Sequence, residues 1–162
     1  MTKKTSATES LWREFAQHAG LSGADYQVVA FGDSAGMATE LAALVVAGTK
    51  RATASLRRDY ADGRLPLPAV GDLVVVVDGA GGPRCIWRTT EIEIKPLSGV
   101  DAGFAWDEGE GDRTRDDWLA MHRRYFARQA RRDGFEMHDA IETVFERFTV
   151  VWPLAIADAD PS

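Results

Sequence analysis

The spacing of apolar residues divides the chain into helical and extended segments. Apolar side chains recur every three to four positions in several stretches, the pattern of a helix with one buried face. Helices are predicted over four segments: 6–18, 35–47, 99–106 and 114–132. Three of these segments are followed by glycines of the kind that end helices: Gly20, Gly48 and Gly134.

Five shorter segments have the composition of β-strands: 26–31, 52–56, 73–77, 84–94 and 142–152. Leu73–Val77 is a run of β-branched residues between turns, which predicts a buried strand. The glycine-rich segment 79–83 predicts a hairpin loop after it. Because helices and strands do not alternate strictly, the order favours an α+β fold with mostly antiparallel pairing, curled toward a small barrel.

Length and charge narrow the classes of function. A chain of 162 residues is expected to form one domain with a real core. The net charge of −6 argues against binding of polyanions by the whole surface. A local basic surface stays open, because an acidic stretch at 101–117 runs directly into an arginine-rich stretch at 123–132.

The chain offers no signal for a membrane or an oxidising compartment. No apolar run approaches the roughly 20 residues that cross a bilayer, and no apolar signal core follows Lys3 and Lys4. Cys85 is the only cysteine, so it forms no intrachain disulfide and has no metal-site spacing. We expect a cytoplasmic protein.

Lys50 is the first candidate for chemistry. The chain has only four lysines and otherwise uses arginine, although lysine alone loses its proton when burial lowers its pKa. Thr49, Thr53 and Ser55 place hydroxyls around it, and a lysine beside a hydroxyl can act as a general base. The alternative is a solvated lysine after a helix end. In a regular strand Lys50 and Thr53 would point to opposite faces, so a shared site requires a turn between them.

An acidic loop at 106–113 is the second candidate. Clustered carboxylates raise one another's pKa, which suits acid–base work or a divalent metal ion, although the spacing is not that of an EF-hand. Asp112 lies next to a predicted helix start, where a capping role is expected. Glu108 and Glu110 are freer to face a pocket. His122, between apolar neighbours in a helix, is interpreted as a core histidine.

Arginines and aromatic residues offer a possible surface for nucleic acid. Arg57, Arg58 and the 123–132 face could clamp phosphates, or form a solvated surface paired with acids. Four aromatic residues could stack a base or belong to the core: Tyr60, Trp87, Trp106 and Tyr125. No Ser-His-Asp order, phosphate loop or zinc spacing is present, so we expect neither a metal ion nor a cofactor.

Several short segments, in this order, resemble the ASCH-domain family of the PUA-like superfamily. They are Phe31-Gly32-Asp33-Ser34, Leu44 to Ser55, Pro68 to Asp72, Thr89 to Ile92, Phe104 to Asp112, and Glu146-Arg147-Phe148. The resemblance covers about 25–152. It is to the longer bacterial ASCH-domain proteins and, more distantly, to the 4-acetylcytidine amidohydrolases. It implies a PUA-like, mostly antiparallel β-barrel of about five or six strands with flanking helices. We divide the chain into an N-terminal helical extension (1–24), the ASCH domain (25–153) and a C-terminal tail (154–162).

The resemblance also implies an RNA- or nucleoside-associated protein, and a hydrolase that removes the acetyl group of acetylated cytidine. By motif position the catalytic residues are Lys50 as proton acceptor, Thr53 as nucleophile or water-positioning hydroxyl, and Glu108 as acid–base partner, with Glu110 as the alternative to Glu108. Expected substrate contacts are Arg51, Ser55, Arg57, Tyr60, Trp106 and Glu110.

Two other functions stay open: a non-catalytic RNA-binding module and a ribonuclease acting on single-stranded RNA. The expected partner is RNA or a nucleoside-like small molecule, with no membrane partner. The sequence is compatible with a homodimer.

Overall fold

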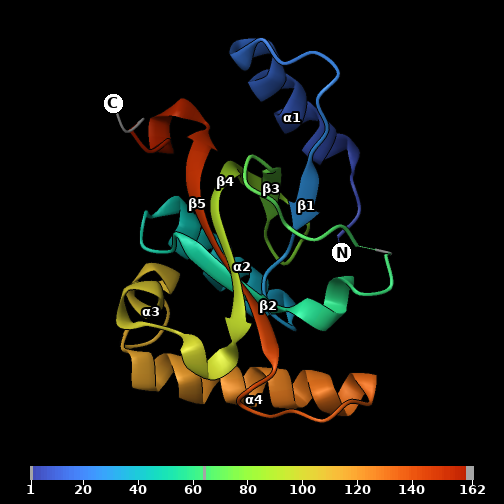
Figure 1. Ribbon diagram of the computed structural model, residues 1–162. Helices are drawn as coiled ribbons and strands as arrows, with labels where there is room; N and C mark the ends of the chain where they lie inside the picture. Colours follow the sequence, from blue (N-terminus) through green and yellow to red (C-terminus); the bar gives the residue numbers. More distant parts are fainter. Residues whose placement is uncertain (1, 64, 160–162) are drawn as a thin grey trace.

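Five strands form one curved sheet in the computed structural model, which describes residues 2–63 and 65–159 (Figure 1). The strands are β1 (Gln27–Val29), β2 (Ala52–Leu56), β3 (Leu73–Val77), β4 (Pro83–Pro96) and β5 (Glu142–Trp152). Their order is β1-β3-β4-β5-β2, with β1 parallel to β3 and all other pairs antiparallel. Within the described residues the edge strands β1 and β2 do not pair, so the sheet is a curled half-barrel. The α+β, mostly antiparallel prediction is confirmed.

The strand β3 is buried on both faces, which explains its unbroken apolar run. Val74 and Val76 pack inside the curl with Trp87 and Phe148, in one core cluster. Their neighbours Val75 and Val77 point the other way, into a second cluster under the N-terminal helix. Because successive side chains in a strand alternate faces, a strand covered on both sides needs apolar residues at every position.

The long strands β4 and β5 bend around the curl. Their pairing shifts register at two places, between Ile86 and Trp87 and between Thr89 and Glu91. A shift of this kind inserts an unpaired residue, which bends the strand and increases its twist. The second shift lies next to the pairing of Thr89 with Phe148.

Four α-helices cover the sheet: α1 (Ser6–Ala19), α2 (Ala35–Val46), α3 (Ala102–Glu108) and α4 (Arg115–Asp133). In Figure 1, α4 runs across one end of the sheet with α3 beside it, and α1 lies at the opposite end. Local sequence sets their starts, since Thr5, Ser34, Asp101 and Thr114 each accept a hydrogen bond from a backbone N–H of the first turn.

All the predicted α-helices and strands are present. The strands β2, β3 and β5 have the predicted bounds, and the other elements have shifted ends. The largest shift is in α3, which was predicted over 99–106 and begins three residues later. The cause is local: Leu97–Gly99 forms a 3-10 turn, and the Asp101 side chain accepts from Phe104 N at 2.7 Å, which caps the helix there. No helix in the described residues is long and apolar enough to cross a membrane.

The described segments near both ends of the chain pack on the sheet. Trp12 and Phe15 of α1 are buried with Tyr26 and Val28. After β5 the chain forms a short 3-10 turn, Leu154–Ile156, and Asp158 accepts hydrogen bonds from Val150 N and the Arg51 side chain. Residue 1 of the expected extension and residues 160–162 of the expected tail lie outside the described residues. The proposed domain boundaries stay predictions.

Candidate functional site

The backbone turns between α2 and β2, and this turn directs Lys50 inward. Gly48 adopts a left-handed conformation (φ 89), which favours glycine. The amides of Thr49 and Lys50 both donate to Leu44 O, at 3.0 and 3.1 Å. Arg51 N then donates to Asp107 O at 2.6 Å. The turn that a joint Lys50–Thr53 site requires is therefore present.

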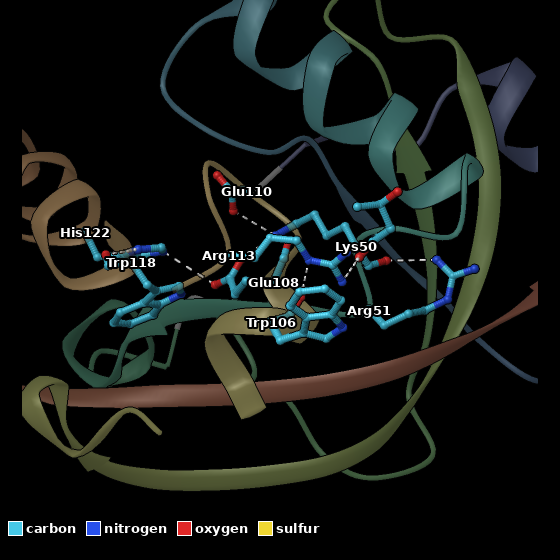
Figure 2. A network of polar contacts seen from close by, with 9 residues as sticks. Lys50, Arg51, Trp106, Glu108, Glu110, Arg113, Trp118 and His122 are labelled. Atoms are coloured by element: carbon cyan, nitrogen blue, oxygen red, sulfur yellow. Dashed lines mark hydrogen bonds and ion pairs between the residues drawn. The ribbon is translucent and has the colours of Figure 1, made fainter. Parts of the chain in front are cut away.

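The Lys50 side chain is only 1% exposed and its ammonium is held by two carboxylates. Nζ donates to Glu108 Oε2, to Glu110 Oε2 at 3.0 Å and to the Glu108 backbone oxygen at 3.3 Å (Figure 2). An ammonium has three protons to donate, and all three have acceptors here. Lys50 is therefore a buried cation with three hydrogen-bond acceptors, and not the solvated lysine after a helix end that the sequence left open.

A close backbone contact places the acidic loop against Lys50. Glu108 ends α3, and Gly109 follows with φ 73. A Cβ at Gly109 would lie 2.4 Å from Thr49 O, so only glycine allows the loop to approach this closely. Arg113 also stabilises the acidic loop. It donates to Trp106 O at 2.9 Å, and its guanidinium stacks 3.7 Å from the Trp106 ring centroid.

His122 of α4 completes the cluster. Its Nδ1 lies 2.9 Å from Trp118 O, which can only accept, so Nδ1 carries a proton. Nε2 then faces Glu108 Oε1 at 3.4 Å, and that oxygen is buried without a hydrogen-bonding partner. A proton on Nε2, or a hydrogen-bond donor from a bound ligand, would give Glu108 Oε1 a hydrogen-bonding partner.

The ionisation of the cluster follows from burial and charge together. Burial alone would lower the pKa of Lys50, but the charges of Glu108 and Glu110 outweigh it and the pKa is raised. Burial alone would raise the pKa of Glu108, but the opposing interactions, of which the charge of Lys50 is the largest, outweigh it and the pKa is lowered. For Glu110, burial dominates and raises the pKa to about 6, against the opposing charge of Lys50. Glu110 is therefore the group of the three that changes protonation near neutral pH.

A first cavity of about 260 Å³ opens over the cluster. Lys50, Glu108, Glu110 and His122 line it together with Thr53 of β2. Arg124 and Arg128 of α4 also line this cavity. The arrangement brings together a fixed cation, a titratable carboxyl and a hydroxyl, the components of acid–base catalysis.

A second cavity of about 260 Å³ adjoins the first. The two share five lining residues: Phe31, Gly32, Thr53, Ala54 and Tyr125. Ser55, Tyr60 and Glu146 line the second cavity, with Ser55 Oγ 2.7 Å from the Tyr60 hydroxyl. Burial raises the pKa of Glu146 to about 7, although the hydrogen bond from Thr89 opposes the shift. The cleft therefore has two chambers with a titratable carboxyl in each.

Three of the expected substrate contacts are not among the described residues that line either cavity. The Arg51 guanidinium is occupied by Asp158, at 2.8 and 2.9 Å, and by the carbonyls of Val45 and Lys50. Arg57 lines a separate surface hollow beside His138. Trp106 is 57% exposed and packs on Arg113. Their roles as substrate contacts stay predictions.

Glu108, Glu110 and His122 also have the geometry of a metal site, with one donor atom from each within 4.8 Å of the others. Lys50 Nζ already lies against both carboxylates. A cation placed among them would have to overcome repulsion from the ammonium. The donor set therefore fits a buried lysine better than a divalent metal ion.

Sequence reasoning missed two side chains of the cleft. His122 was interpreted as a core residue and proves to face Glu108. Glu146 carried a signal that we did not use, because it occupies the same alternating positions of β5 as Val144, Phe148 and Val150. A carboxylate among inward-facing apolar residues of a strand indicates a buried acid, and its exposed fraction is 7%.

Comparison with known proteins is consistent with this fold and cleft. The ASCH domain family model matches residues 27–152. The chain belongs to the ASCH-domain family. This family is associated with RNA binding. A comparison with curated proteins gave no match.

Two solved structures share the ASCH fold of this chain. The ASCH domain from Lactobacillus crispatus JV V101 is 27% identical with a TM-score of 0.82, over 93% of this chain and 97% of that one. Protein EF3133 from Enterococcus faecalis V583 is 33% identical with a TM-score of 0.81, over 88% of this chain and 86% of that one. Because both alignments cover more of this chain than residues 27–152, the shared fold extends beyond the family match.

Proposed function

We propose that this ASCH domain is a hydrolase that removes an acyl group from the amino group of a nucleoside, with N4-acetylcytidine as the substrate to test. One observation carries the proposal: a buried ammonium, Lys50, is held by two carboxylates beneath a cavity that Thr53 also lines. A buried, paired charge costs desolvation energy, so a cavity built around one is a candidate for chemistry.

The ionisation states of Lys50, Glu108 and Glu110 suggest catalytic roles that differ from those implied by the family resemblance. The raised pKa of Lys50 argues against its acting as the proton acceptor. Lys50 instead supplies a fixed positive charge, and Glu108, whose pKa is lowered, anchors it. Glu110, with a pKa of about 6, takes and returns the proton. Thr53 positions the attacking water.

In the proposed step, a water oxygen bonds to the acyl carbonyl carbon and gives one proton to Glu110. The carbonyl oxygen becomes an oxyanion that the Lys50 ammonium stabilises. Once Glu110 is neutral it no longer offsets the positive charge of Lys50, so the ammonium stabilises the oxyanion more strongly. When the carbonyl re-forms, the C–N bond breaks and Glu110 returns the proton to the departing amino group. Cytidine and acetic acid are the products.

The second candidate is RNA binding without chemistry. Arg124 and Arg128 line the first cavity, where they could meet phosphates. Arg128 also donates to Asp33 at 2.8 Å, so part of its charge is already neutralised. We rank this function second, because phosphate contacts alone would not require a buried lysine between two carboxylates.

The test is acetate release from N4-acetylcytidine. Wild type is expected to release acetate, and Glu110→Gln to lose at least about 100-fold in kcat/KM because the amide accepts no proton. The wild-type rate should fall as the pH drops below about 6, where Glu110 is already protonated. Lys50→Ala leaves Glu108 as an unpaired buried charge and costs about 3–5 kcal/mol of stability, so Glu110→Gln is the cleaner variant.

Glu142→Gln is the matched control, because Glu142 is an exposed carboxyl that lines neither cavity of the described cleft. It should keep the wild-type rate. A folded wild type that binds the nucleoside or a short RNA but releases no acetate would contradict the hydrolase and support the binding module. Shortened oligonucleotides, lost in Glu110→Gln, would instead support a ribonuclease.

A further inference from the structure

Glu146 is held by a chain of hydrogen bonds that begins at Trp87. Trp87 Nε1 lies 3.2 Å from Thr89 Oγ1, and Thr89 Oγ1 lies 2.6 Å from Glu146 Oε2. An indole N–H only donates and an ionised carboxylate only accepts, so the Thr89 oxygen accepts from Trp87 and gives its own proton to Glu146. The direction of both bonds is thereby determined, and Oε2 is committed as an acceptor.

The other carboxyl oxygen, Oε1, takes no hydrogen bond of this kind from the described side chains, and Glu146 lines the second cavity. A buried acid with one oxygen held and one oxygen toward a cavity can accept a hydrogen bond from a ligand. Asp72 lines the same cavity, but its Oδ2 already accepts from Ala69 N at 2.9 Å. Each acid thus has one oxygen that accepts a hydrogen bond, and Glu146, which is 7% exposed, is the more deeply buried acceptor of the two.

The rest of the second cavity suits a flat ring. Its walls are mainly apolar or aromatic: Val28, Phe31, Leu65, Pro66, Pro68, Val74 and Trp87. Apolar walls with a few convergent polar groups are typical of sites for planar ligands. The Ser55–Tyr60 hydroxyl pair adds a second polar point on the wall.

We propose that the second cavity binds a nitrogenous base, and that Glu146 selects bases that carry an exocyclic amino group. The N–H of that group donates to Glu146 Oε1. Above about pH 7, where Glu146 is ionised, a base with a carbonyl at the same position would direct an oxygen at the carboxylate, and the two would repel each other.

The position of Glu146 connects this subsite to the first cavity. Glu146 of β5 lies directly opposite Thr53 of β2 in the antiparallel ladder, and side chains in such pairs are neighbours. Thr53 lines both cavities. A substituent on the amino group that extends past Thr53 therefore reaches the Lys50 cluster. This connection rests on the proposed hydrolase, whereas the choice of base does not.

The test uses Glu146→Gln, in which the hydrogen-bond chain decides the orientation of the new amide. Thr89 is 1% exposed, and Glu146 is the acceptor of its hydroxyl proton among the described residues. Thr89 therefore still donates in the variant, so the amide oxygen takes the Oε2 position and the NH2 group faces the cavity. The acceptor toward the ligand becomes a donor. We expect wild type to bind cytidine about tenfold more tightly than uridine at pH 8, and Glu146→Gln to reverse that order.

Dissociation constants for cytidine and uridine would be measured by NMR titration, with Glu142→Gln as control and circular dichroism to verify folding. The control should keep the wild-type preference. An equal preference in wild type and Glu146→Gln, or no binding of either nucleoside by wild type, would overturn the proposal. Binding needs no turnover, so a protein that prefers cytidine but never releases acetate would refute only the hydrolase.

Discussion

The chemistry of Lys50 is decided by its neighbours. Burial by itself favours a neutral amine, yet Glu108 and Glu110 raise the pKa and keep the ammonium charged. Glu108 at the end of α3 and Glu110 in the loop after it lie 58 and 60 residues away in the sequence. The same physics acts in the opposite direction on Glu146, which has no buried cation as a partner among the described residues and whose pKa rises to about 7. Two buried groups of the same cleft thus differ in charge because only one has an oppositely charged partner.

Glu146 should make stability depend on pH in a defined window. The folded protein keeps a proton on this carboxyl up to about pH 7, whereas the ordinary value is 4.5. Its contribution to stability is therefore complete below pH 4.5 and is lost as the pH rises to about 7. Glu146→Gln cannot ionise, so its free energy of unfolding should exceed that of wild type by about 1–3 kcal/mol at pH 8.

Urea denaturation at both pH values measures this effect. At pH 4, where the wild-type carboxyl is also neutral, the two proteins should unfold at similar urea concentrations. Glu142→Gln, at an exposed position on the same strand, should show no such dependence. A difference between Glu146→Gln and wild type of the same size at both pH values would show that Glu146 is not a buried acid of raised pKa.

The active elements of the cleft are connections rather than helices or strands. The α2–β2 turn supplies Lys50, and the α3–α4 loop supplies Glu110 directly after Glu108. The two connections meet where Gly109 touches Thr49 O and Arg51 N donates to Asp107 O. α4 adds His122 from the opposite side. The scaffold holds these loops in place, and the contact between them sets the distance from ammonium to carboxylate.

Gly109→Ala tests this contact, and Gly134→Ala is its matched control. Both glycines have a left-handed conformation, with φ 73 and φ 74, but a Cβ at Gly134 would meet nothing within 4 Å. We expect Gly134→Ala to cost about 1 kcal/mol from conformational strain alone. Gly109→Ala should cost about 2–4 kcal/mol, because the new methyl group also forces the two loops apart.

Guanidinium denaturation of the two variants gives the difference directly. Gly109→Ala should also weaken any activity or ligand binding at the cleft, whereas Gly134→Ala should not. Equal losses of stability in the two variants would mean that the loops tolerate separation and that Gly109 is selected only for its conformation.

The whole molecule is held by three apolar clusters that follow the curl of the sheet. One lies between the sheet and α3 and α4, one inside the curl with α2, and one under α1. The third cluster joins Trp12 and Phe15 to β1, β3 and β4. This packing makes α1 part of the structural core of the protein, although the family match begins only at residue 27.

Trp12→Ala should therefore destabilise the entire domain. Trp12 is 7% exposed and stacks on Tyr26 with ring centroids 4.8 Å apart. We expect a loss of about 3–5 kcal/mol, with unfolding still in one transition. Trp106→Ala, which removes a tryptophan that is 57% exposed, should cost under about 1 kcal/mol. Thermal unfolding followed by circular dichroism compares the stability of the two variants. If Trp12→Ala kept near-wild-type stability, residues 1–24 would be a separable extension and the prediction would be wrong.

Much of this architecture could be predicted because it depends on local patterns. Periodicity, glycines and capping residues located every helix and strand, and the ordered motifs identified the family. The predictions were weaker where distant residues decide the outcome. The motif pointed to Lys50 as a proton acceptor, and only the positions of Glu108 and Glu110 show why its charge is retained. For Glu146 a local signal existed, its inward position on β5, but its hydrogen bond from Thr89, 57 residues away, could not be predicted from the sequence.

By itself the sequence determined the elements, the α+β class, the family and the segments from which the cleft is built. These follow from side-chain periodicity and short motifs, which act between neighbours in the chain. The tertiary structure alone decided which carboxyl titrates, that Thr89 donates to Glu146 and that two chambers share Thr53. The physical reason is that protonation and hydrogen-bond direction depend on burial and on charges brought together by folding, and these are not properties of any single segment.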